Sequence, residues 1–301
     1  MSTATVERPR ASGPAGPPPP DKAAETAGVL GDALGVLSLL ALWLVAQVLF
    51  LGDLSESRAQ TIAFRELRTE LAAATAPTGG AVAPGEPVAL LTIPTLGREM
   101  VVVEGTASGD LLAGPGHRRD TPLPGQEGVS LVYGRARTYG GPFGDLTKLR
   151  AGDAITALTQ QGKATFRVDA VRRAGDPVPQ PVPAGGARLT LVTAEGQEGP
   201  LSALSAGSVV YVDAALQGKA FVATSGRPVA VPRSERAMAA DTSALPLLAL
   251  CLAALLAIVA WVGFARRRWP TALVWLVTAP VVLALAWSTT DVAMRLLPNL
   301  L

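Results

Sequence analysis

The sequence predicts a mainly β domain outside the membrane, attached to three apolar helical spans. The 301-residue chain is 49% hydrophobic with a mean hydropathy of +0.34, which is too apolar for an ordinary soluble protein. The roughly 190 residues between the first and second apolar stretches instead contain short strand-like runs separated by turn residues. A chain of that length is ample for one compact domain.

Three uncharged stretches account for the predicted spans. They are Ala33 to Leu51, Ala244 to Ala265 and Trp269 to Thr290, each near the roughly 20 residues that a helix needs to cross the hydrocarbon core. We therefore predict transmembrane helices over 31–52, 244–265 and 269–290. The alternative, buried helices of a soluble protein, fits poorly with such lengths.

The first stretch also has a signal-peptide interpretation, because Arg8, Arg10 and Lys22 precede it. Its apolar run is longer than the usual signal core, and 52–55 lacks the small-x-small pattern of a cleavage site. We therefore predict a retained anchor.

Basic residues set the predicted orientation. Arg266, Arg267 and Arg268 separate the last two stretches with no acidic residue beside them, so loop 266–268 is expected to be cytoplasmic. Binding of nucleic acid or a lipid head group is the alternative for this cluster. The domain and the tail 291–301 then lie outside and the N-terminus lies inside. Segment 1–30, rich in Pro, Ala and Gly, is predicted to be a disordered cytoplasmic tail.

The exported part divides into a helix, a β domain and a linker. Ser55 to Ala74 has no Pro or Gly and spaces its apolar residues loosely as a helix does, so 53–85 is predicted to be a juxtamembrane helix and linker. The domain covers 86–216, and Thr165 to Ala170 alternates polar and apolar residues as a half-buried strand does. Many such runs without long helices between them indicate a sandwich or closed barrel. The Pro-containing, basic segment 217–243 is predicted to be a second linker.

Composition excludes several kinds of site. A net charge of +2 gives no argument for a polyanionic partner. One His and one Cys in the whole chain cannot form a clustered metal site, so we predict no metal and no cofactor. Cys251 lies in a predicted span and His117 in an exported loop, so they cannot work as a nucleophile and base. Cys251 is interpreted as a packing residue and His117 as a surface or loop hydrogen-bonding residue.

An ordered series of short signatures lies between Leu90 and Asp213: "LLTIPTLG", "VVVEGT", "LLAGPGH", "TPLPGQEGVSLVYG", "TYGGPFGDLTKLRAGD" and "RLTLVTA". The series resembles the sortase family, most closely its class E branch from high-GC Gram-positive bacteria. The resemblance implies a closed eight-stranded barrel at the outer face of the cytoplasmic membrane. It also implies cleavage of an LPxTG or LAxTG sorting signal by a Cys thiolate, assisted by a His and an Arg, and transfer to a cell-wall amine.

The three reactive positions implied by the resemblance carry other residues. Ala194 ends the strand where the family has Cys, and Arg135 stands at the position of the His. Gly207 or Ser208 matches the family's Arg, and no Arg or Lys occurs between Ala194 and Leu216. A methyl group cannot attack a carbonyl, and a protonated guanidinium cannot act as a base.

These positions suggest a sortase-like pseudoenzyme of the cell envelope that binds a sorting-signal-like peptide or an envelope protein. The residues considered as ligand contacts are Tyr133, Arg135, Arg137, Tyr139 and Glu195. One alternative is a true enzyme with replacement chemistry, in which Glu195 or Asp145 acts on water. Another is a structural role in a membrane assembly, with the Ala-rich faces of the last two spans contacting partners.

Overall fold

The computed structural model describes residues 38, 42–43, 46–47, 51–195, 207–265 and 268–301. The chain divides into two units, Met1–Leu44 and Val45–Leu301, and the second contains all the strands and helices described below. The predicted tail 1–30 lies outside the described residues, as do most of the predicted span 31–52 and two of the three arginines in loop 266–268.

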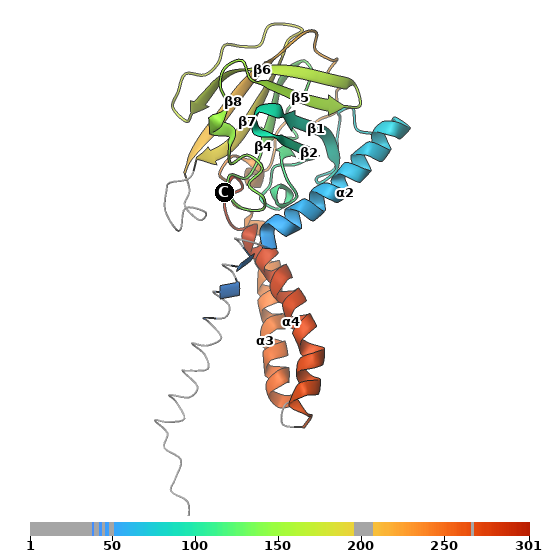
Figure 1. The fold of residues 1–301 in the computed structure, drawn as a ribbon, viewed down its shortest axis with the longest axis vertical. Helices are drawn as coiled ribbons and strands as arrows, with labels where there is room; N and C mark the ends of the chain where they lie inside the picture. The colour runs from blue at the N-terminus through green and yellow to red at the C-terminus, as the bar shows by residue number, and fades with distance from the viewer. Residues whose placement is uncertain (1–37, 39–41, 44–45, 48–50, 196–206, 266–267) are drawn as a thin grey trace, which may run out of the picture. The chain divides into compact units, whose positions relative to one another are not determined.

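Eight strands close into a barrel (Figure 1), which confirms the predicted mainly β, closed-barrel class. The order around the barrel is β1-β2-β3-β4-β7-β8-β6-β5, with β2–β3 and β4–β7 parallel and the other pairs antiparallel. The strands are β1 Pro87–Ile93, β2 Arg98–Glu104, β3 Gly116–His117, β4 Gly128–Tyr133, β5 Ala154–Thr159, β6 Gly162–Arg173, β7 Ala187–Glu195 and β8 Ser208–Leu216.

Alternating apolar residues fill the barrel interior. In β6 the inward set includes Phe166 and Val168, both at most 2% exposed. Ala170, which the alternation places on the same face, is exposed. The pairing of β6 with β8 shifts between Val168 and Ala170, and such a bulge turns the residues beyond it to the other face. The strand prediction is therefore right, but the face of Ala170 is wrong.

The strand that the sequence did not indicate is β3, which has only two residues. His117, interpreted as a surface or loop residue, lies in this strand and is 1% exposed. A two-residue strand has no alternation for a sequence pattern to display, because period-2 reasoning needs four or more residues.

Helix α2, Gly52–Ala73, packs along β1 and β2 (Figure 1), as the predicted helix over Ser55 to Ala74 anticipates. Its buried face carries Ala63 and Leu67, which join Val101 of β2 in a small apolar cluster. The helix ends at Ala74, whose left-handed φ of 56° stops the helical hydrogen bonding.

The segment 217–243, predicted to be a linker, is packed on the barrel. The main-chain N–H of Phe221 donates to Gly125 O over 2.8 Å, and its ring lies against the barrel core. Glu235, in the 3₁₀ turn Arg233–Glu235, is 4% exposed and forms an ion pair with Arg119. Polar composition alone does not reveal such contacts, because the partners of Phe221 and Glu235 lie elsewhere in the chain.

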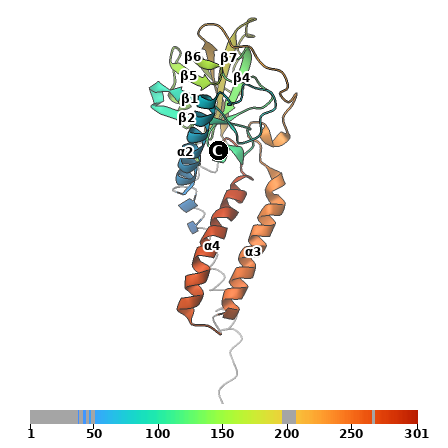
Figure 2. The same ribbon diagram turned by 90° about the vertical axis from the view of Figure 1, so that its right-hand side faces the viewer.

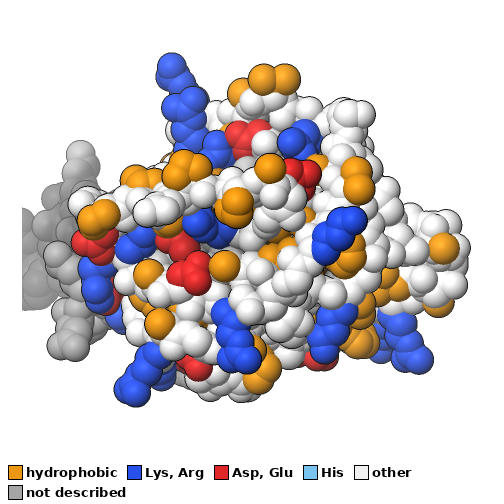
Figure 3. Space-filling view, turned by 90° about the horizontal axis from the view of Figure 1, so that it is seen from above, with side chains coloured by type: hydrophobic (Ala, Val, Ile, Leu, Met, Phe, Trp, Pro, Cys, Tyr) orange, Lys and Arg blue, Asp and Glu red, His pale blue; other side chains and the backbone are white. Residues whose placement is uncertain are grey.

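Two long apolar helices follow, α3 Leu245–Ala265 and α4 Thr271–Met294, and they lie side by side (Figure 2). By length and composition both are able to cross a membrane, with mean hydropathies of 2.7 and 1.9 in their apolar windows. The described residues thus contain two such helices, not the three predicted, and α4 continues to Met294, past the predicted boundary at 290. The face seen from above in Figure 3 carries Lys and Arg side chains close to Asp and Glu, with apolar side chains between them.

Candidate functional site

The carboxyl ends of β4 and β7 meet at one edge of the barrel, because these strands run parallel and are hydrogen-bonded neighbours. Tyr133 pairs with Val192, so the register continued by two residues sets Arg135 level with Ala194. The N–H of Gly134 donates to Val192 O over 3.0 Å. In β8, Ser208 pairs with Glu195, the residue after Ala194. Arg135, Ala194 and Ser208, the positions that the resemblance aligns with reactive residues, therefore lie at one edge of the barrel.

Arg135 is fully buried at this edge and holds four oxygens. Its Nη1 donates to Thr138 Oγ1 over 3.0 Å and to Leu301 O over 3.2 Å. Its Nη2 donates to Ser108 O over 3.0 Å and to Ser108 Oγ over 2.7 Å. Burial lowers the pKa of the guanidinium to about 10, partly offset by Tyr139. The group therefore stays protonated at neutral pH and acts as a hydrogen-bond donor, not as a base.

Ala194 lies in a buried apolar cluster on the outer side of β4, β7 and β8. The strands contribute Tyr133, Val192 and Ala194, with Ala194 4% exposed. Leu300, from the segment after α4, belongs to the same cluster and is 0% exposed. The remaining members are Leu111 and Ala136, with Leu131, Val209, Tyr211, Ala237 and Met238 packed against them. Ala194 is thus covered by other parts of its own chain, and this set is called the Ala194 cluster below.

A polar cavity of about 500 Å³ borders the same edge. Its lining includes the acidic residues Asp53, Asp145 and Glu195 and the basic residues Arg98 and Arg137, together with Thr193 and Ala194 of β7. Hydrogen bonding by Lys148 lowers the pKa of Asp145, and Arg173 does the same for Glu195. Arg173 binds Glu195 through Nε and Nη2 over 2.6 and 2.8 Å. Both carboxyl groups are therefore ionised and weakly basic.

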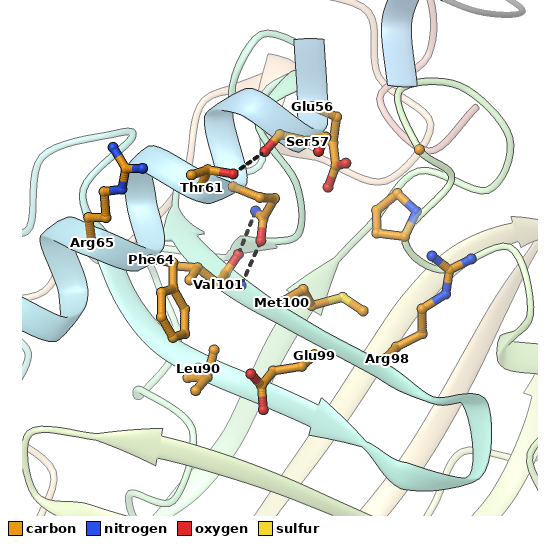
Figure 4. Close-up of a pocket in the computed structure, with 13 residues that line it drawn as sticks. Glu56, Ser57, Thr61, Phe64, Arg65, Leu90, Arg98, Glu99, Met100 and Val101 are labelled. Atoms are coloured by element: carbon orange, nitrogen blue, oxygen red, sulfur yellow. Dashed lines mark hydrogen bonds between the residues drawn. The ribbon is translucent and has the colours of Figure 1, made fainter. Parts of the chain in front are cut away.

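A second cavity of about 410 Å³ lies between α2 and the β1–β2 pair and shares Arg98 and Gly140 with the first (Figure 4). Gln60 of α2 binds the edge of β2, donating to Val101 O over 3.0 Å and accepting from Val101 N over 2.7 Å. Burial, followed by repulsion from Asp53, raises the pKa of Glu56 in this cavity to about 7.

The five predicted ligand contacts fall into two groups. Arg137 and Glu195 line the polar cavity, whereas Arg135 and both tyrosines are buried in the protein. The Tyr139 hydroxyl donates to Asp291 Oδ1 of α4 over 2.6 Å, and burial raises the pKa of this phenol. Tyr139 thus connects the site to α4.

His117 does not join this site. Its Nδ1 lies 2.8 Å from Glu104 Oε2 and its Nε2 lies 3.0 Å from Pro122 O. Cys251 lies in α3. Over the described residues, no three His, Cys, Asp or Glu side chains are grouped to hold a metal ion.

Sequence reasoning missed the partners of Arg135. Thr138 lies only three residues beyond Arg135, but Ser108 and Leu301 belong to other segments, 27 and 166 residues away along the chain. No local pattern marks them. The one available signal was a charged residue, Arg135, at a position whose neighbours predict an interior, since a buried guanidinium requires several acceptors.

The parallel strands β4 and β7 of this closed barrel thus end beside a polar cavity. Comparison with known proteins gives the family: the model of the sortase domain matches residues 91–199. Sortase D of Bacillus subtilis (strain 168) is 32% identical over 84 residues, which is 28% of this chain and 41% of that protein. The match thus spans about two fifths of the relative's length. The barrel domain of this chain belongs to the sortase family.

The solved structures similar to this chain include two further sortases. A Clostridium perfringens sortase D5 transpeptidase is 19% identical with a TM-score of 0.43, covering 55% of this chain and 99% of its own. Sortase E from Streptomyces avermitilis is 32% identical with a TM-score of 0.37, covering 52% of this chain and 100% of its own.

Proposed function

We propose that this chain is a membrane-anchored sortase-like pseudoenzyme of the cell envelope, which binds a peptide or partner protein without transpeptidation. The observation that carries the proposal is Ala194, the last residue but one of β7, which stands where the resemblance places the attacking Cys. The only Cys in the sequence is Cys251 in α3, so the barrel has no thiol to form an acyl intermediate.

The proton-transfer and substrate-holding positions support the same conclusion. Arg135 keeps its proton, and its Nη1 and Nη2 groups donate hydrogen bonds to Ser108, Thr138 and Leu301. Ser208, at the position of the family's Arg, has a hydroxyl that cannot supply a guanidinium's charge. Loss of such a nucleophile–base unit costs about a million-fold in turnover by comparison with other enzymes. No cofactor is proposed.

Replacement chemistry by Glu195 or Asp145 is disfavoured by their surroundings. A general base at neutral pH needs a pKa near 7, whereas cationic partners lower the pKa of both carboxyl groups. The third candidate is a purely structural role in a membrane assembly. This role would apply if the chain binds no peptide.

The proposed location is the cytoplasmic membrane of a Gram-positive, actinobacterial-type cell, with the barrel outside. The apolar lengths of α3 and α4 and the three arginines at 266–268 support this proposal.

The test uses the full chain in lipid nanodiscs with a fluorescent LPxTG-type peptide. Anisotropy measures binding, and mass spectrometry of the same samples measures cleavage and transfer. Saturable binding without product is the expected result. Product formation that disappears in Glu195→Gln would instead establish replacement chemistry, and absence of binding would leave the structural role.

A further inference from the structure

The segment after α4 lies on the Ala194 edge, and specific contacts hold it there. Asn299 is fully buried, and its Nδ2 donates to Thr106 O over 2.7 Å and to Arg236 O over 2.9 Å. Its main-chain N–H donates to Ala239 O over 2.9 Å. These bonds fix the segment to the barrel domain at Thr106 and to the segment 217–243 packed on it.

The next two residues reach the altered site itself. Leu300 accepts a hydrogen bond from Ala136 N over 2.9 Å and buries its side chain in the Ala194 cluster. The main-chain oxygen of Leu301 accepts from Arg135 Nη1 and, over 2.5 Å, from Thr138 Oγ1. The residues at the family's nucleophile and His positions thus both serve this segment, one by apolar packing and one by hydrogen bonding.

We propose that segment 297–301 is an internal ligand of the sortase cleft, which closes the Ala194 edge against any other peptide until the segment is released. The replaced residues fit this occupant: a Cys-to-Ala change leaves an apolar surface for Leu300, and Arg135 supplies donors for Leu301. The proposal deepens the proposed function, since it states how the same site is regulated, but closure itself is measurable without any peptide.

The release step is local. The segment makes its contacts to the site through one side-chain cluster and a few hydrogen bonds, whereas the barrel strands close on themselves independently. Truncating Leu300 is therefore expected to shift the segment toward release while the barrel stays folded.

The chain has a single cysteine, Cys251, so one substitution removes every native thiol before a reporter thiol is introduced. Full-length Cys251→Ala protein in nanodiscs has no thiol, so Ala194→Cys adds one reporter at the covered position. The rate of maleimide labelling then measures how often the segment leaves. Slow labelling is expected with Leu300 present, and Leu300→Gly should accelerate it by at least about tenfold, equivalent to about 1.4 kcal/mol.

Two further variants separate closure from general damage. Leu300→Met keeps the apolar volume and should label slowly, and Leu296→Gly, outside the Ala194 cluster, should label as slowly as the parent. An unchanged thermal unfolding midpoint in Leu300→Gly would show that the barrel stays folded. Labelling that is fast with Leu300 present, or equally accelerated by Leu296→Gly, overturns the proposal.

A peptide arm distinguishes this inference from the proposed function. The segment begins with Leu297-Pro298, the pair that also opens the LPxTG probe. The probe should bind Leu300→Gly at least about tenfold more tightly than the parent. If labelling behaves as expected but neither protein binds the probe, closure stands and peptide binding fails. If labelling is fast in both and both bind equally, closure fails and peptide binding stands.

Discussion

His117 is the only imidazole in the chain and its two ring nitrogens both face oxygen atoms. A carbonyl oxygen only accepts, so Nε2 carries a hydrogen and donates to Pro122 O. Nδ1 lies 2.8 Å from Oε2 of Glu104, whose side chain is also buried. The residue therefore stabilises the junction of β2 and β3 and lies apart from the edge at Ala194.

This pairing predicts a large effect of His117→Leu, which keeps much of the volume but leaves Glu104 buried without its partner. We expect a loss of about 3 kcal/mol in the free energy of unfolding, because an orphaned buried charge is costly. Denaturant unfolding of the full chain in nanodiscs measures it. Glu195→Gln, which breaks the largely exposed pair with Arg173, is the control and should change much less. Equal losses in both variants would contradict this assignment.

At the scale of elements, helix α2 carries a residue that is hydrogen-bonded to the barrel and a carboxyl group that titrates near neutral pH. Gln60 binds both main-chain groups of Val101, whereas Glu56 on the same helix has a pKa raised to about 7 from an ordinary value of 4.5. A carboxyl whose pKa is higher when folded stabilises the docked helix below pH 4.5, and this contribution is lost as the pH rises through 7.

We therefore expect the amides of α2 to be better protected from hydrogen exchange at pH 6 than at pH 8, after correction for intrinsic rates. Glu56→Gln should flatten this dependence, because an amide side chain does not titrate in this range. Glu66→Gln, on the exposed side of the same helix, should keep the dependence of the parent chain. A dependence that persists in Glu56→Gln would assign it to another group.

The elements also show which parts of the structure can be predicted from the amino-acid sequence. Long strands such as β6 and β7 and the helix α2 follow from alternation and spacing that lie within one window of residues. The two-residue β3, the packing of Phe221 and the docking of Leu300 depend on partners far along the chain, so local patterns do not contain them. The resemblance located the altered edge at Ala194 and Arg135, but only tertiary contacts reveal what covers it.

At the scale of the whole molecule, the barrel contacts one end of the α3–α4 pair, and the loop between the two helices lies at the other end. Asp241 before α3 and Arg295 after α4 are joined by a main-chain hydrogen bond of 2.9 Å, and Ser108 donates to Met294 O over 3.1 Å. The barrel therefore contacts the pair at the end opposite Arg268. The 21 residues of α3 extend about 31 Å at 1.5 Å per residue, close to the roughly 30 Å of hydrocarbon in a bilayer.

If α3 and α4 span the membrane, the barrel and residue 268 lie on opposite sides of it, and the proposed orientation, based on the arginines at 266–268, has residue 268 inside the cell. In a Cys251→Ala background, Ser208→Cys at the exposed start of β8 should react with a membrane-impermeant maleimide on intact Gram-positive cells. Arg268→Cys should react only after the membrane is opened. Labelling of Arg268→Cys in intact cells with protection of Ser208→Cys would reverse the orientation, and labelling of both would show that the helical pair does not cross the bilayer.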